Sequence, residues 1–365
     1  MRNPKETSVS TLASTVRTQT ENPDNPDQSP FTFANYLYVR YDNSVGDDRL
    51  PDGSVPPRTT FWYSPDITFS PADLGGSPVL GTAVTLEARI HNDGFADAIG
   101  VFVEFNWFDP SLAIVEANKH TIGTKIVSVP HDGYKPVTCP TPWFPTFANG
   151  GHECLVVQCS CPGEGTNGLK HPYNAGLDRH VGQRNVNLSP AGTLLKFALK
   201  VPNPFSDPTS FSIHLTSTVV GVDFRELEGL SAQTVSALIG NSATGHLATP
   251  DGRPLKLTTF DVTARDFDLR IANITKMRMK EHRGRAQRSV EGRQMAATAT
   301  QPRGRTIGEL HLDRNEMAEL QMVIPAQDIE DKQFLVHQIT QMVKGTVVGG
   351  YTIIVSPKGF SRHQP

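Results

Sequence analysis

A segment of strict alternation, VTLEARIHNDG from Val84 to Gly94, sets the strongest limit on the fold of this chain. Apolar residues occupy every second position from Val84 to Ile90, and polar residues occupy the positions between them. A period of two places successive side chains on opposite faces, so the segment predicts a β-strand with one buried face. The Asn-Asp-Gly that follows predicts a turn. Because similar segments recur along most of the chain, we predict an all-β protein.

The predicted strands fall into two groups. The first group covers residues 36–41, 59–69, 84–91, 100–108, 112–116, 122–129, 154–161 and 183–188. The second covers residues 195–201, 211–219, 255–262, 267–274, 307–312, 318–324, 334–339 and 351–355, and a short helix capped by Ser231 is predicted at 231–239. A chain of 365 residues suits two domains. The predicted fold is therefore two tandem immunoglobulin-like β-sandwiches with long loops.

The predicted organisation along the chain has four parts. Residues 1–30 are polar and form a disordered N-terminal arm, which could become ordered on a neighbouring subunit. Residues 31–190 form the first sandwich, 191–356 the second, and 357–365 a C-terminal tail. Long loops at 42–58, 130–151 and 162–182 are expected to carry function, since loops of that length are seldom only connectors.

The charge balance limits the partners. The chain holds 34 basic and 37 acidic residues, which argues against nucleic acid and against an anionic membrane surface. The sequence has no secretory signal and no run of about 20 apolar residues. We expect a cytoplasmic protein, or a component of a particle that is released without a Sec signal.

A basic insertion at 276–305 lies inside the second group of strands. It contains nine Lys or Arg and two Glu, with Arg283, Arg285 and Arg288 at its centre. Two interpretations remain open: a solvated loop between strands, or a contact with an acidic partner surface or nucleic acid. No aromatic residue is present to stack on bases, which argues against sequence-specific RNA binding.

Cysteine and histidine gather between residues 152 and 180. Zinc prefers these side chains, so a structural zinc has as candidate ligands His152, Cys159, Cys161, His171 and His180. No other cofactor is predicted. The spacing also fits buried cysteines that pack as small apolar residues, with Cys159 and Cys161 on one strand face and Cys154 on the other. A disulfide from Cys139 is the third alternative.

Aromatic residues supply candidate binding positions. Trp107 continues the alternation of its strand, which predicts a core residue. Trp143 and Phe144 stand among prolines in PTPWFPTF, so we predict an exposed platform that could stack on a glycan. No G-x-S-x-G, H-E-x-x-H or Walker motif is present, and we expect no enzyme. An enzyme around His152, His171, His180 and Asp178 would require a bound metal.

Four motifs in order suggest a family resemblance. These are YSPDI from Tyr63, LEARIHNDG from Leu86, GHECLVVQC from Gly151 and HVGQRNVNL from His180. Together they resemble the immunoglobulin-like, CARDB-like modules of large bacterial proteins, over about Phe61 to Leu188. The segment from Ile307 to Val355 resembles the closing strands of a second such module. The resemblance implies binding or scaffolding and transfers no catalytic residue.

Two functional hypotheses follow. The first is a non-enzymatic structural or protein-interaction protein in a bacterial or phage-like assembly, with protein partners that include a second copy of the chain. The unpaired backbone groups of edge strands offer one mode of assembly. The alternative is a glycan- or metal-binding module that uses the aromatic or Cys/His residues above.

Overall fold

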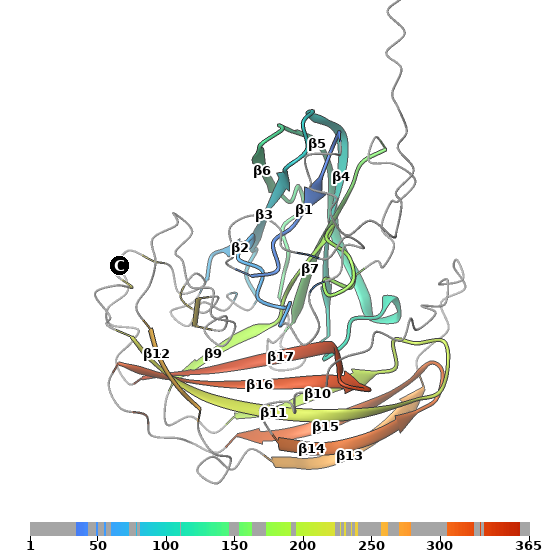
Figure 1. Ribbon diagram of the computed structural model, residues 1–365, viewed down its shortest axis with the longest axis vertical. Coiled ribbons are helices and arrows are strands. Elements are labelled where there is room, and N and C mark those ends of the chain that lie inside the picture. Colours follow the sequence, from blue (N-terminus) through green and yellow to red (C-terminus); the bar gives the residue numbers. More distant parts are fainter. Residues whose placement is uncertain are drawn as a thin grey trace, which may run out of the picture.

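The computed structural model describes most of both predicted sandwiches (Figure 1). The described residues are 34–42, 49, 55, 60–72, 78, 81–109, 111–145, 153–162, 173–190, 195–222, 227, 230, 235, 238–239, 257–261, 270–278, 305–324, 329 and 332–357. This part is all-β, as predicted, with strands β1 to β17 and one 3-10 turn, η2 (Glu116–Asn118). Val235, Leu238 and Ile239 are helical, within the helix predicted at 231–239.

The first sandwich has two four-stranded antiparallel sheets. In one, β3 (Thr85–Asn92) pairs with β6 (Gly133–Thr138) on one side and with β1 (Leu37–Tyr38) and β2 (Ile67–Ser70) on the other. The other has the order β5 (Lys119–Val129), β4 (Ala98–Phe108), β7 (Cys154–Ser160) and β8 (Val181–Arg184). Because the chain changes sheet between β3 and β4 and between β5 and β6, the topology is immunoglobulin-like.

The alternation in β3 has the predicted consequence. Leu86, Ala88 and Ile90 are buried and pack against Val101 and Val103 of β4 in the core between the two sheets. The polar residues between them lie on the outer face of the sheet.

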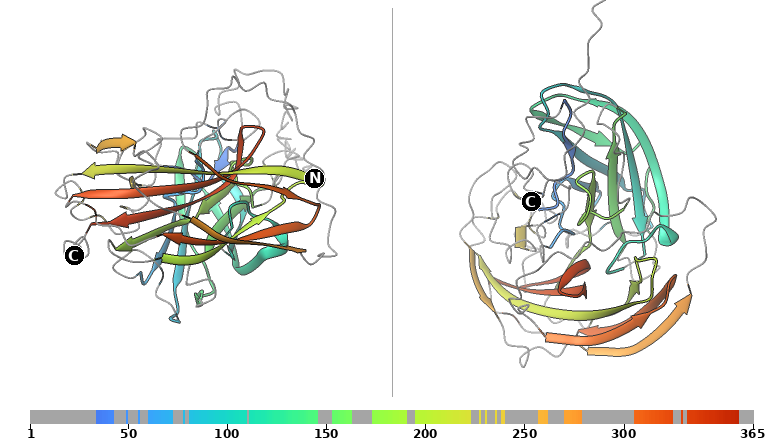
Figure 2. Two further views of the ribbon diagram at one scale, coloured as in Figure 1. Left: turned by 90° about the horizontal axis from the view of Figure 1, so that it is seen from below. Right: turned by 45° about the vertical axis from the view of Figure 1, so that its right-hand side comes forward.

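The second sandwich packs a three-stranded sheet against a six-stranded one. The small sheet has the order β10 (Leu195–Pro202), β15 (Glu316–Ile324), β13 (Arg270–Arg278). The large sheet has the order β12 (Leu257–Asp261), β11 (Thr209–Val222), β16 (Gln333–Val343), β17 (Thr346–Ser356), β9 (Val186–Pro190), and β14 (Arg305–Leu312) also pairs with β11. Strand β9 runs parallel to β17. Figure 1 and the right-hand view of Figure 2 place the first sandwich above this large sheet.

A single residue, Asn185, connects the two sandwiches, because β8 ends at Arg184 and β9 begins at Val186. The Asn185 N–H donates to the carbonyl of Trp62 (3.0 Å), and its carbonyl accepts from the N–H of Thr352 in β17 (3.2 Å). The connection is therefore bonded to both sandwiches and contains no linker about which they could turn.

Trp62 and Tyr63 fill the joint between the sandwiches. Both side chains are completely buried. The Trp62 indole N–H donates to the hydroxyl of Thr352 (3.1 Å), and the side-chain amide of Gln338 donates to the Tyr63 hydroxyl (2.9 Å). One hydrophobic cluster extends from Phe108 in β4 through these rings into the second sandwich. The two sandwiches consequently share a core.

Four local predictions were wrong. Of the strand predicted at 59–69, the described residues form only β2, which begins at Ile67, and an isolated bridge at Tyr63. Residues 112–116 form no strand; Leu112 donates its N–H to the Lys200 carbonyl (2.9 Å) and packs in the shared core instead. The predicted loop at 130–151 contains β6, whose Lys135 and Pro136 hid the pattern of an edge strand. The predicted strand at 183–188 is two strands in different sheets, because β9 pairs with β17. The change of sheet thus falls at Asn185, inside the predicted first domain (31–190).

Within the described residues, the helical positions form no segment with the length and hydropathy needed to cross a membrane.

The shared core makes a prediction at the Gly349–Gly350 pair of β17. A Cβ atom at Gly349 would lie 2.1 Å from the carbonyl oxygen of Leu112, which is backbone and cannot rotate away. We expect Gly349→Ala to lower the free energy of unfolding by about 1–3 kcal/mol, measured by urea denaturation. Gly133→Ala is the control, because its Cβ would meet the nearest atom at 3.5 Å. Equal stability of the two variants would contradict the close contact.

Candidate functional site

The predicted platform at Trp143 and Phe144 is only half present. Trp143 pairs with Val84 through two backbone bonds of 2.7 and 2.8 Å, and this turns its indole into the first core, where it is 4% exposed. The prediction of an exposed tryptophan is therefore corrected. Phe144, the next residue along the extended backbone, is 57% exposed. Trp107 packs partly against the same core and stacks on His120, with ring centroids 3.9 Å apart.

The described Cys and His residues do not converge on a metal. Cys159 and Cys161 face the first core, whereas Cys154 faces the shared core, as the strand period predicts. His180 is buried, with Nδ1 2.6 Å from a carboxylate oxygen of Asp178. Among the residues that the structure describes, no three His, Cys, Asp or Glu side chains gather. His152 and His171 lie outside the described residues, so the zinc site stays a prediction.

The three arginines of the basic insertion, Arg283, Arg285 and Arg288, also lie outside the described residues. The ends of the predicted insertion (276–305) are strand residues in different sheets: residues 276–278 close β13 in the three-stranded sheet, and Arg305 opens β14 in the six-stranded sheet.

A buried charge cluster lies beneath the outer face of the first sandwich. The Asp66 carboxylate accepts from the backbone N–H of Arg40 (2.9 Å) and from its guanidinium (2.6 Å), and His91 Nε2 lies 2.9 Å away. Burial acts to raise the pKa of Asp66, but the charges and hydrogen bonds of His91 and Arg40 hold it well below its ordinary range. The cluster fastens the segments before β2 to β3.

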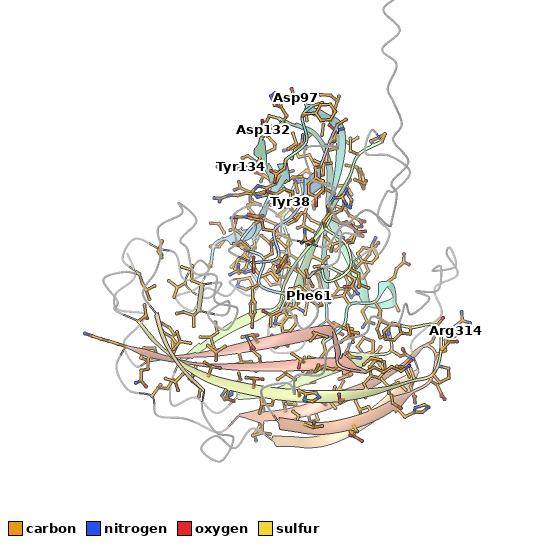
Figure 3. The ribbon with its side chains drawn as sticks, in the orientation of Figure 1. Tyr38, Phe61, Asp97, Asp132, Tyr134 and Arg314 are labelled. Carbon is orange, nitrogen blue, oxygen red and sulfur yellow. The ribbon has the colours of Figure 1, made fainter. Side chains whose placement is uncertain are left out.

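A ladder of rings crosses this outer face. Tyr38, His91 and Tyr134 are cross-strand partners on β1, β3 and β6. Their ring centroids are 4.9 and 5.5 Å apart, and the Arg89 guanidinium lies 5.6 Å from the Tyr134 ring. Tyr134 is 51% exposed, and Figure 3 shows it on the same flank as Tyr38. Sequence reasoning missed this surface because Tyr134 fell in a predicted loop.

A second polar cluster includes Tyr173, which lies within the predicted loop at 162–182. Glu104 of β4 accepts from Lys119 (2.9 Å) and from the side-chain amide of Gln158. Lys119 also donates to the Tyr173 hydroxyl (2.6 Å), and the Tyr173 ring packs 5.6 Å from that of Phe108. Burial would lower the pKa of Lys119, but its bonds to Tyr173 and Glu104 raise it above the ordinary value.

The motifs that carry the CARDB-like resemblance hold the fold together. Asp66 of YSPDI anchors the charge cluster, and Asn185 of HVGQRNVNL forms the joint. Asn92 of LEARIHNDG accepts from the N–H groups of Tyr36 (3.0 Å) and Gly94 (3.1 Å) and donates to a carbonyl (2.9 Å). These motif residues are structural, and the candidate sites lie beside them.

No protein-family model matches the chain, and no curated protein matches it. The CARDB-like assignment therefore stays a resemblance. Among solved structures, red sea bream transglutaminase aligns with 80% of this chain at 9% identity and a TM-score of 0.18, and the chain spans 31% of it. Collagen adhesin from S. aureus aligns with 80% of this chain and 92% of its own, at 9% identity and a TM-score of 0.18. The fold assignment rests on the strand order and registers above.

The Asp66 cluster predicts a specific pH dependence. The pKa of Asp66 in the folded protein lies below its value in the unfolded chain. The stability that the ionised carboxylate gives to the fold is therefore present at neutral pH and is lost as pH falls below the ordinary carboxyl range. We expect Asp66→Asn to lower the free energy of unfolding, measured by urea denaturation, by about 3–5 kcal/mol at neutral pH. The difference in this free energy between the variant and wild type should shrink in acid. Asp97→Asn, at an exposed carboxylate bonded to His131, is the control. A difference that is independent of pH would contradict the assignment.

The four cysteines predict low thiol reactivity. All four are buried and no disulfide joins them, and burial raises the pKa of Cys154 to about 12. Since the thiolate is the reactive form, we expect iodoacetamide to leave the native protein unmodified and to modify all four cysteines after denaturation, as measured by intact mass. Rapid alkylation of the native protein, or a disulfide in the protein as isolated, would contradict this arrangement.

Proposed function

We propose that this chain is a non-enzymatic structural or protein-interaction protein that serves in a bacterial or phage-like assembly. The joint at Asn185 carries the proposal, because it makes two β-sandwich modules one body with a shared core. A body without a linker holds the surfaces of its two modules at a fixed spacing. That property suits a component that positions other proteins.

The polar clusters support the non-enzymatic assignment. The Asp66 carboxylate is bonded to Arg40 and His91, and Glu104 is bonded to Lys119. Each carboxylate thus lies against a cationic partner, an arrangement that lowers its strength as a general base. Four cysteines that form no disulfide agree with a reducing compartment, which supports the proposed cytoplasmic location or a particle assembled there.

The contact surface that we propose is the outer face of β4 and β5. Phe102 and Ile126 are direct cross-strand partners there and are 40% and 69% exposed. Exposed apolar pairs on a sheet face are suited to docking of a protein partner or a second copy. The adjacent edges are protected: the exposed Lys125 of β5 donates to the Thr138 carbonyl of β6 (3.4 Å), and β6 contains Pro136. We therefore favour docking on the face over strand addition at these edges.

The ring ladder favours glycan binding as the second candidate function. The half-exposed Tyr134 ring, beside the Arg89 guanidinium, offers an apolar surface next to hydrogen-bond donors. The metal alternative depends on His152 and His171, outside the described residues.

A double variant tests the docking surface. We expect Phe102→Lys with Ile126→Lys to abolish both self-association in sedimentation velocity and protein capture from the native lysate, because charges at these positions oppose apolar contact. Thr346→Lys adds a charge at an exposed position of β17, in the second sandwich and away from this face, and should leave both unchanged. A wild-type chain that sediments as a monomer and enriches no protein would contradict the proposed function.

A further inference from the structure

Asn106 in β4 has a buried amide group without hydrogen-bond partners. The residue is 1% exposed, and neither its Nδ2 nor its Oδ1 atom has a partner. Gln158 on the neighbouring strand β7 is 4% exposed, and its Oε1 atom is also unpartnered. Native proteins satisfy most buried polar groups, so two such amides on adjacent strands require an explanation.

The two amides belong to one enclosed patch. Asn106 lies between Glu104 and Phe108 on the same face of β4, because alternate residues of a strand share a face. Gln158 is the cross-strand partner of Glu104. Tyr173 packs against the Phe108 ring and binds Lys119, which in turn binds Glu104, so the tyrosine extends across the position of Asn106.

We propose that Glu104, Asn106, Lys119, Gln158 and Tyr173 form a closed binding site for a hydroxyl group, carried by a sugar or by water. Glu104 and Lys119 neutralise each other, which favours an uncharged ligand. The unpaired amide of Asn106 can donate a hydrogen bond through Nδ2 and accept one at Oδ1. A hydroxyl group can accept the first bond and donate the second.

Tyr173 is the cover of this site. Its φ of 67° is uncommon for a residue with a side chain and is a source of backbone strain. The turn that follows is held by Asn174, whose side chain accepts from the N–H of Gly176 (3.0 Å). The closed arrangement thus places the unpaired amides beneath a strained residue, and movement of the Tyr173 side chain would admit a sugar hydroxyl to the Asn106 amide. This inference is independent of docking at Phe102 and Ile126.

The first test is the thermal stability of Asn106→Leu in the full chain, since leucine has a similar size and no polar atom. If a hydroxyl group occupies the site in solution, the substitution removes an amide that is hydrogen-bonded to it. We then expect the midpoint of thermal unfolding to fall by about 2–4 °C. Asn203→Leu calibrates this loss, because Asn203 is buried with its amide fully bonded. A raised midpoint in Asn106→Leu would show an empty site and overturn the proposal.

The second test separates the two sources of the hydroxyl. Saturation-transfer NMR with glucose, galactose and N-acetylglucosamine should show transfer to wild type and none to Asn106→Leu. Tyr173→Phe loses the bond to Lys119 and should increase the transfer, whereas Phe95→Ala, at an exposed ring in a turn, should not change it. No transfer, together with a lowered midpoint in Asn106→Leu, assigns the hydroxyl to water. Transfer that survives in Asn106→Leu overturns the assignment of a sugar to this site.

Discussion

The backbone bonds of Asn185 to Trp62 and Thr352 fix how the two sandwiches lie against each other. One residue cannot span a gap, so the last strand of the first sandwich and the first strand of the second must lie end to end. This places Trp62 against Gly350 and Thr352 and excludes any side chain at Gly349. The shared core follows from that proximity, because the rings at the joint touch apolar residues of both sandwiches.

The joint also explains why strand β7 of the first sandwich is buried on both faces. In β7, Leu155, Val157 and Cys159 face the first core, whereas Cys154 and Val156 face the shared core. Toward β5 the same sheet face is exposed, at Thr121, Thr124 and Ile126 among others. The docking surface that we propose at Phe102 and Ile126 thus lies on the part of this face that stays exposed.

Period-two alternation was sufficient to predict the fold class, because burial of one face of β3 requires an apolar residue at every second position of the sequence. Strand β6 lacks this alternation, because Val137 is its one buried residue and Pro136 interrupts the pattern. The inward orientation of Trp143 depends on pairing with Val84, a contact over a long sequence separation. The Asn106 patch was equally hidden, because an asparagine between Glu104 and Phe108 resembles any polar residue on a solvated face.

Differential scanning calorimetry of the full chain shows whether the two sandwiches form one rigid body. A shared core should make the sandwiches unfold together, so we predict a single transition with equal calorimetric and van't Hoff enthalpies. Two separate transitions, or a calorimetric enthalpy about twice the van't Hoff value, would show that the sandwiches unfold independently and would contradict the account.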